Sequence, residues 1–232
     1  MECVIYGGNS KLISRTIDFF EQKFDHIYII SRKYKGKQSN KIISIDYEKT
    51  ENLLEHLNKI EFKTKKVFFI SAAAYSTNNL FVNESQESIN EIMNANIINN
   101  ILITQFILKK TIKNNYGKFI YISSFRADYP TNGTGLYSST KKTIEKLFES
   151  LAIEYSKFNQ KFLILKIGLF EDGLSKNLPF DINSTSFIKK NIASGRVSST
   201  KDIIKALEFL IESDYINGCE LDLTGKFKFD VR

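Results

Sequence analysis

The sequence predicts an α/β fold in which a doubly wound parallel sheet of seven strands carries helices on both faces. Short runs rich in β-branched and aromatic residues alternate with longer runs whose apolar residues recur at helical spacing. Strands joined by helices imply βαβ crossovers, which make the strands parallel. The chain of 232 residues has two prolines and no glycine- or serine-rich linker, so a single domain spanning 1–232 is expected.

Short apolar runs without proline predict the strands. In chain order they are 3–6, 26–30, 42–45, 67–71, 118–123, 162–167 and 220–223. Longer amphipathic runs predict helices at 11–24, near 47–60, and at 87–110, 135–156 and 200–212. The first helix repeats apolar residues from Leu12 to Phe24, and the last begins at a Ser/Thr cap before Asp202. Ligands of such sheets bind beyond the carboxyl ends of the strands, so chemistry is expected just after each strand.

Composition excludes several classes of protein. Hydrophobic residues make up 42% and charged residues 25%, as in globular proteins. No apolar run approaches the ~20 residues that span a bilayer, and the first residues lack the basic start of a signal peptide, so a cytoplasmic protein without a membrane partner is expected. Two cysteines, Cys3 and Cys219, cannot form a disulfide scaffold for a chain of this length. His26 and His56 stand alone, so no metal site is expected.

The net charge of +7 leaves more than one interpretation open. It could serve nucleic acid, an acidic membrane face or an anionic ligand, or the lysines could simply be solvated. No aromatic-basic RNA motif or helix-turn-helix pattern is present, so no nucleic-acid partner is expected.

Two strand ends indicate a phosphate-bearing ligand. Gly7 and Gly8 follow the first strand and lead straight into a helix, a turn that lets phosphate approach backbone N–H groups, although the same turn also serves simply to reverse the chain. About 20 residues further on, a unit that binds NAD(H) places an acid for the ribose 2′-hydroxyl. Here the second strand ends in Ser31, Arg32 and Lys33, which could hold a 2′-phosphate or form an ordinary basic loop.

The strongest motif is a tyrosine and a lysine four positions apart at the start of a helix. Tyr137 and Lys141 share one helix face, and an ammonium beside a phenol favours the phenolate and lowers its pKa. Such a tyrosine can exchange a proton near neutral pH. Ser124 follows a strand 13 residues earlier, and its hydroxyl could bind a substrate carbonyl.

With these residues, the chain resembles the short-chain dehydrogenase/reductase family, in its single-domain branch, over nearly its whole length. The resemblance implies a Rossmann-like fold. Ser124, Tyr137 and Lys141 match three catalytic positions, and Asn96 matches the active-site asparagine. The segment 71–74 stands where the family has Asn-Asn-Ala-Gly, and Gly168 matches the glycine after the sixth strand. Residues 218–221 and Gly225 resemble the family's last strand and the glycine that ends it.

The resemblance also implies roles. Tyr137 would be the general acid/base toward the carbonyl and Ser124 would polarise its oxygen. Lys141 would lower the tyrosine pKa and bind the nicotinamide ribose, and Asn96 would hold a relay water. The cofactor would be NADP(H) rather than NAD(H), because Arg32 stands where NAD-binding members have an acid. Its expected contacts are Gly7, Asn9, Ser10, Lys11, Leu12, Ser31, Arg32, Lys33, Asp46, Tyr47, Ser71, Ala72, Ala73, Tyr137, Lys141 and Gly168.

The chain departs from the family pattern at the glycine loop, where Lys11 and Ile13 replace two glycines. An isoleucine at the third position predicts a shifted helix or an altered loop. The enoyl-reductase branch spaces tyrosine and lysine seven apart, and Ile144 occupies that position here. A non-catalytic NADP-binding regulator on the same fold is the alternative function.

The segment 169–199 corresponds to the family's variable substrate loop. It is rich in small and polar residues, with few apolar anchors such as Phe180 and Phe187. A sugar-like or otherwise oxygenated carbonyl or alcohol is therefore expected as substrate, and a 3-oxoacyl thioester stays open. The resemblance further suggests a homodimer or homotetramer.

Overall fold

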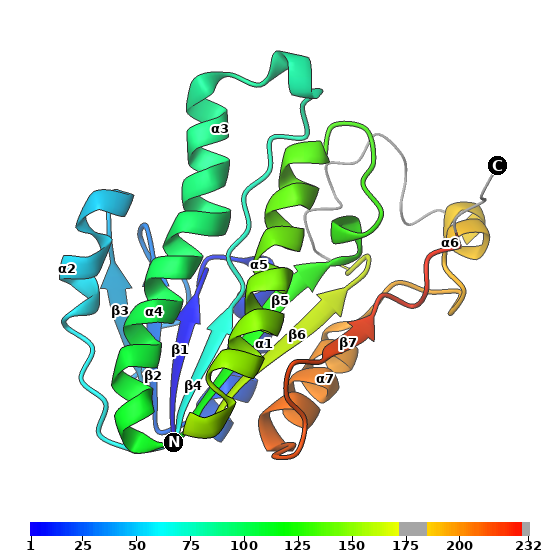
Figure 1. Ribbon diagram of the computed structural model, residues 1–232. Helices are drawn as coiled ribbons and strands as arrows, with labels where there is room; N and C mark the ends of the chain where they lie inside the picture. The colour runs from blue at the N-terminus through cyan, green and yellow to red at the C-terminus, as the bar shows by residue number, and fades with distance from the viewer. Residues whose placement is uncertain (172–184, 229–232) are drawn as a thin grey trace.

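The computed structural model describes residues 1–171 and 185–228, and their seven strands form one parallel sheet (Figure 1). The strands are β1 (Glu2–Tyr6), β2 (His26–Ser31), β3 (Ile42–Asp46), β4 (Val67–Ser71), β5 (Gly117–Ser124), β6 (Gln160–Ile167) and β7 (Glu220–Leu223). Their order across the sheet is β3-β2-β1-β4-β5-β6-β7. The direction of winding therefore reverses between β1 and β4, and this is where such sheets bind ligands. The predicted fold class is confirmed.

Helices cover both faces of this sheet. They are α1 (Lys11–Lys23), α2 (Leu53–Leu57), α3 (Gln86–Met93), α4 (Asn99–Thr111), α5 (Gly135–Glu154), α6 (Thr185–Asn191) and α7 (Thr200–Glu212). One face packs against α1 and α7, and the other against α2, α4 and α5 (Figure 1). The short α6 lies beyond the carboxyl end of the sheet, away from both layers (Figure 1).

Alternate residues of each strand feed the two cores. In β1, Cys3 and Ile5 pack in the core under α1 and α7, whereas Val4 and Tyr6 belong to the core under α2, α4 and α5. This follows from the two-residue period of a strand. Because both faces are covered, the strands read as continuous apolar runs rather than as alternating ones.

Two predicted helices differ from the structure in their details. The helix expected near 47–60 is reduced to a 3₁₀ turn, Thr50–Asn52, followed by the short α2. The helix expected at 87–110 contains a π-helical turn, Asn94–Ile98, between α3 and α4. Helix α6 was not predicted. It falls within the predicted substrate loop 169–199, of which residues 172–184, including Phe180, lie outside the described residues.

Side-chain caps fix the helices that matter for the site. The Ser10 hydroxyl accepts the N–H of Ile13 at 3.2 Å and starts α1, and Ser199 and Asp202 form a capping box at the start of α7. Cys3 and Cys219 are both free. Within residues 1–171 and 185–228, no helix is long and apolar enough to cross a membrane.

Candidate active site

A pocket of about 520 Å³ opens at the carboxyl ends of the central strands. The predicted residues that line it are Gly7, Asn9, Ser10, Lys11, Leu12, Ser31, Arg32, Tyr47, Ala72, Ala73, Ser124, Tyr137, Lys141 and Gly168. Lys33, Asp46, Ser71 and Asn96 are outside its lining. Most residues that the sequence singled out therefore meet in one cavity, although they come from segments more than 100 positions apart.

The glycine turn shapes one end of the pocket. Gly7 has φ of +94°, and a Cβ there would lie 2.4 Å from the backbone nitrogen of Ala73, so only glycine fits. Lys11 is the first residue of α1 and faces the pocket. Ile13 is fully buried in the core beneath, so the helix accommodates this departure from the family's glycine by packing.

Basic and polar groups surround the adjoining part of the pocket. Arg32 is largely exposed, and its Nη1 lies 3.6 Å from the Glu91 carboxylate. Asn9 ties the glycine turn to the chain after β2, because its side chain accepts the N–H of Lys35 at 2.9 Å and also donates to the carbonyl of Lys33. This part can hold an anion next to a helix N-terminus.

Asp46 and Ser71 have structural contacts instead of lining the pocket. Asp46 accepts the backbone N–H of Tyr34 at 3.0 Å and the Ser44 hydroxyl at 2.6 Å, which holds the loop after β2. The Ser71 hydroxyl is fully buried and donates to Asn100.

Asn96 lies in the π-helical turn and clamps the chain after β4. Its side-chain amide accepts the N–H of Tyr75 at 2.8 Å, donates to the Tyr75 carbonyl at 2.9 Å, and donates to the Thr140 hydroxyl at 3.0 Å. The amide is thus engaged with protein atoms and joins the pocket wall to α5. Its expected part in holding a relay water stays a prediction.

Ser124, Tyr137 and Lys141 gather at the other end of the pocket. Ser124 is the last residue of β5, and Tyr137 and Lys141 lie on the buried face of α5. The Lys141 ammonium donates to the Ile122 carbonyl at 2.9 Å and lies 5.9 Å from the centre of the Tyr137 ring.

Burial dominates the electrostatics of this group. It raises the pKa of Tyr137, while the nearby Ser124 hydroxyl and the charge of Arg126 act in the opposite direction. Burial lowers the pKa of Lys141 to about 7, and the charge of Glu145 acts in the opposite direction. The expected lowering of the tyrosine pKa by Lys141 is therefore not found in this geometry: the phenolate is costly to bury, and the lysine is only partly charged at neutral pH.

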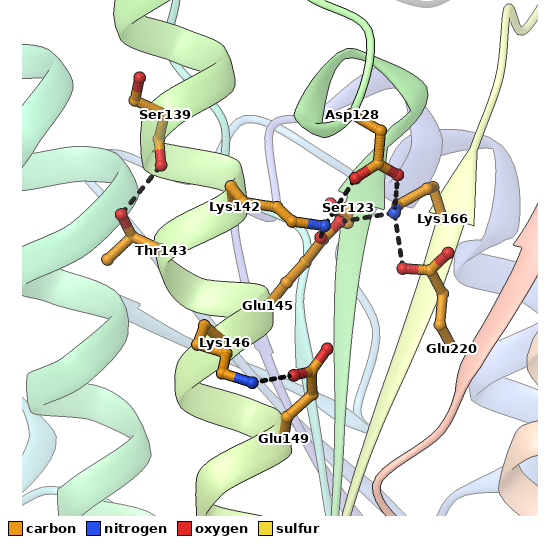
Figure 2. Close-up of polar contacts among 10 residues, drawn as sticks. All are labelled: Ser123, Asp128, Ser139, Lys142, Thr143, Glu145, Lys146, Glu149, Lys166 and Glu220. Atoms are coloured by element: carbon orange, nitrogen blue, oxygen red, sulfur yellow. Dashed lines mark hydrogen bonds and ion pairs between the residues drawn. The ribbon is translucent and has the colours of Figure 1, made fainter.

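An ion network includes Ser123, the residue that precedes Ser124 in β5 (Figure 2). The neighbouring Ser123 hydroxyl donates to the buried Glu145 of α5. Glu145 lies 3.3 Å from the Lys166 ammonium of β6, which also contacts Asp128 and Glu220. The network joins β5, β6, β7 and α5 next to the site.

Sequence reasoning missed several lining residues, among them Tyr6, Tyr75, Phe125 and Arg126. Tyr6 and Tyr47 receive hydrogen bonds from Asn99 at 3.3 and 3.2 Å and form a polar floor. Tyr47 was predicted from the sequence, and for Tyr6 its position at the end of β1 was the available signal. Among the described residues, no group of three His, Cys, Asp or Glu side chains could hold a metal ion.

A family model described as "Enoyl-(Acyl carrier protein) reductase" matches residues 26–225. The chain belongs to the short-chain dehydrogenase/reductase family. It is 24% identical to the 3-oxoacyl-[acyl-carrier-protein] reductase of Bos taurus over 232 residues, and this alignment covers 96% of each chain. It is 22% identical over 231 residues to carbonyl reductase family member 4 of Xenopus laevis, with 96% of each chain covered.

Two solved structures show the same fold as this family member. "4-hydroxyisoleucine dehydrogenase mutant complexed with NADH and succinate" superposes with a TM-score of 0.85 at 18% identity, covering 97% of both chains. "ElxO with NADP Bound" superposes with a TM-score of 0.80 at 22% identity, also covering 97% of both.

Proposed function

We propose that this family member interconverts a carbonyl compound and an alcohol, using NADP(H), with Tyr137 as the general acid/base. One observation carries the proposal: Ser124, Tyr137 and Lys141 meet at one end of a pocket whose other end is a glycine turn and a helix N-terminus. A protein that only bound a dinucleotide would not need a buried tyrosine and lysine at this spacing.

The residues present suit a dinucleotide. The positive φ of Gly7 keeps side-chain atoms out of the turn, and the N-terminus of the 13-residue α1 opens into the pocket beside it. Pyrophosphate would be held there, with Lys11 adding positive charge. Tyr47 and the alanines after β4 would line the adenosine side, and Lys141 would bind the nicotinamide ribose.

When bound, NADP(H) would supply the hydride for the carbonyl carbon, or accept it in the reverse direction. Tyr137 donates its phenolic proton to the carbonyl oxygen, which completes the alcohol. Because burial raises the pKa of Tyr137, the phenol is protonated and ready to act as the acid at neutral pH. Ser124 positions and polarises the carbonyl oxygen. Lys141, when protonated, stabilises the phenolate that remains until a proton from solvent replaces the one transferred.

Arg32 supports NADP(H) over NAD(H). No carboxylate stands at the end of β2 to accept a ribose 2′-hydroxyl, and the guanidinium faces the pocket, where it could pair with a 2′-phosphate. Of the two similar structures, one contains NADP and the other NADH, so the choice rests on this residue.

The relatives' names favour a 3-oxo compound over a sugar-like one as the first substrate to try. Carbonyl reduction is preferred to enoyl reduction, because Ile144, seven positions after Tyr137, is fully buried in the core and leaves no lysine at that spacing. Self-association through α4 and α5 is supported by the exposed Ile101 and Ile153 on those helices.

Replacing Tyr137 by Phe tests the catalytic proposal. Purified protein with NADPH and a panel of carbonyl compounds should oxidise the cofactor, followed by absorbance. Tyr137→Phe should reduce kcat by about 10²–10⁴-fold, the contribution of a positioned general acid. Tyr129→Phe, which changes a tyrosine outside the pocket, is the control and should retain activity. If the Tyr137 variant turns over like the wild type, the catalytic role is wrong.

A further inference from the structure

Arg126 is a buried cation at the catalytic end of the pocket that the mechanism above does not use. It lies in the 3₁₀ turn Phe125–Ala127, two residues after Ser124, lines the pocket and is only 9% exposed. Its Nη1 donates to the Thr131 hydroxyl at 2.9 Å, and the guanidinium carbon lies 5.7 Å from the centre of the Phe125 ring. These contacts fix the side chain but bring no negative charge to it.

The charge of Arg126 is unmatched within the part of the chain that the structure describes. No described carboxylate lies within 4 Å of its guanidinium, and the nearby Asp128 is paired with Lys142 and Lys166 instead. Burial lowers the pKa of Arg126, yet a guanidinium keeps its proton in proteins. A buried charge without a carboxylate partner is costly, and an anion bound in the pocket would supply one.

The position of Arg126 separates this anion from the cofactor phosphates. β5 is two strands away from β1 in the sheet, which is about 10 Å at the usual strand spacing. The glycine turn and Lys11 follow β1, whereas Arg126 follows β5 beside Ser124 and Tyr137. A group held by Arg126 therefore lies next to the reacting carbonyl and not at the pyrophosphate.

We propose that Arg126 binds an anionic group of the substrate, a carboxylate or a phosphate close to the carbonyl, so that the protein acts on small oxo acids or phosphorylated ketones. This inference rests on the proposed function and gives it a substrate class. The planar guanidinium suits such a group because its parallel N–H donors match two oxygens at once. Thr131 holds one of these nitrogens and leaves others for the ligand.

Matched substrate pairs test the proposal. NADPH oxidation is measured with acetoacetate and ethyl acetoacetate, with pyruvate and ethyl pyruvate, and with dihydroxyacetone phosphate and dihydroxyacetone. The anionic member of at least one pair should have a kcat/KM about tenfold or more higher, because a charged hydrogen-bonding site discriminates against a ligand that leaves it unpaired. The first two pairs report a carboxylate and the third a phosphate. Equal or higher values for the neutral member of every pair would overturn the proposal.

Variants assign the preference to this side chain. Arg126→Gln should lower the anion-to-neutral ratio of kcat/KM by about tenfold or more, and Arg126→Lys should fall in between, since it keeps the charge but loses the fork. Arg15→Gln, at an exposed position on α1, should keep the wild-type ratio. An unchanged ratio in Arg126→Gln would refute the assignment, and the wild-type pairs decide the proposal even if this variant does not fold.

A binding measurement separates this inference from the proposed function. Calorimetry with malonate, which is not reduced, should show binding to wild type that Arg126→Gln weakens by about tenfold. If no carbonyl compound is turned over but malonate binds in this way, the anion site stands and the proposed reductase function fails. If neutral ketones are reduced and malonate does not bind, the function stands and the anion site is refuted.

Discussion

Lys141 is the residue at which folding and function conflict. Lys141 is 2% exposed, and its ammonium contacts the carbonyls of Ile122 and Ala73 and the rings of Tyr121 and Tyr137. Burial lowers its pKa from 10.5 to about 7. The fold thus destabilises the charged form of a group whose charge would support the phenolate and bind ribose. Functional sites commonly keep such groups at a cost in stability.

Lys141→Met is expected to stabilise the protein while reducing its activity. Between pH 7 and 10.5 the unfolded state binds more protons at this residue than the folded state, so wild-type stability rises with pH in that window. Methionine does not titrate, and the gain should be on the order of 2–4 kcal/mol at pH 6 and smaller at pH 9. Urea unfolding at both pH values measures it. Lys146→Met, at an exposed site of α5, is the control, and a variant less stable than wild type at pH 6 would contradict the argument.

The sequence predicted the place of a site residue correctly where the spacing of two residues put them on the same face of a helix. Tyr137 and Lys141 are four apart on a helix, and both reach the pocket. Asp46 and Ser71 were expected in the site because they match positions at which the family contacts its cofactor, but a matching position does not fix which way a side chain points. Asp46 turns to Tyr34 and Ser71 to Asn100. Arg126 was missed because it follows Ser124 in an irregular turn with no period to read.

At the scale of elements, the ion network of Figure 2 holds helix α5 to the sheet. Lys166 of β6 is 4% exposed and Glu145 of α5 is 1% exposed as side chains, and they lie 3.3 Å apart. Glu145 also receives the Ser123 hydroxyl. Buried pairs of this kind gain little over apolar residues, but the loss of one partner leaves a charge without compensation. Single substitutions in the network should therefore lower the stability of the protein. The network also holds α5 in one position against β5.

Glu145→Gln should destabilise the protein by about 1–3 kcal/mol, because the buried Lys166 loses one of its three carboxylate partners and the Ser123 hydroxyl loses a charged acceptor. Glu149→Gln, one turn further along α5, breaks the exposed contact with Lys146 and should cost about 0–1 kcal/mol. Chemical denaturation of the two variants side by side measures the difference. Equal effects would show that the network contributes no more than a surface pair does.

Helices and strands were predicted well where the hydrophobic periodicity was strong. They were predicted poorly where local hydrogen bonding changed the form of a helix. The strand Val67–Ser71 and the helix Thr200–Glu212 were predicted with the bounds that the structure has. The π-helical turn Asn94–Ile98 was not, because it interrupts an otherwise helical pattern without a glycine or proline. This turn places Asn96 against Tyr75 and Thr140, and such interruptions are frequent at functional sites.

At the scale of the molecule, the pocket joins two halves of one sheet. The β1–β2 side supplies the glycine turn and Arg32, and the β5–β6 side supplies the groups proposed to act on substrate. Crossovers between parallel strands made this arrangement predictable, because they bring all carboxyl ends to one edge. The contact between the chain after β5 and the chain after β7 was not predictable. There Phe125 stacks on Phe227 with ring centres 4.3 Å apart, and no local pattern predicts a contact between residues so far apart in the sequence.

A ligand that spans both halves should stabilise the whole domain. At a concentration of 100 times its Kd, NADPH should add about 2.7 kcal/mol, or roughly 5–10 °C in Tm for a chain of this size. NADH at the same concentration should give a smaller shift, because it lacks the 2′-phosphate that Arg32 is proposed to bind. Arg32→Ala should bring the two shifts together, whereas Lys33→Ala, whose residue is outside the pocket lining, should leave them apart. Thermal denaturation by circular dichroism measures all of these shifts. If Arg32→Ala keeps the full difference between the cofactors, the 2′-phosphate is bound elsewhere, and the basic end of β2 has no part in selecting NADP(H).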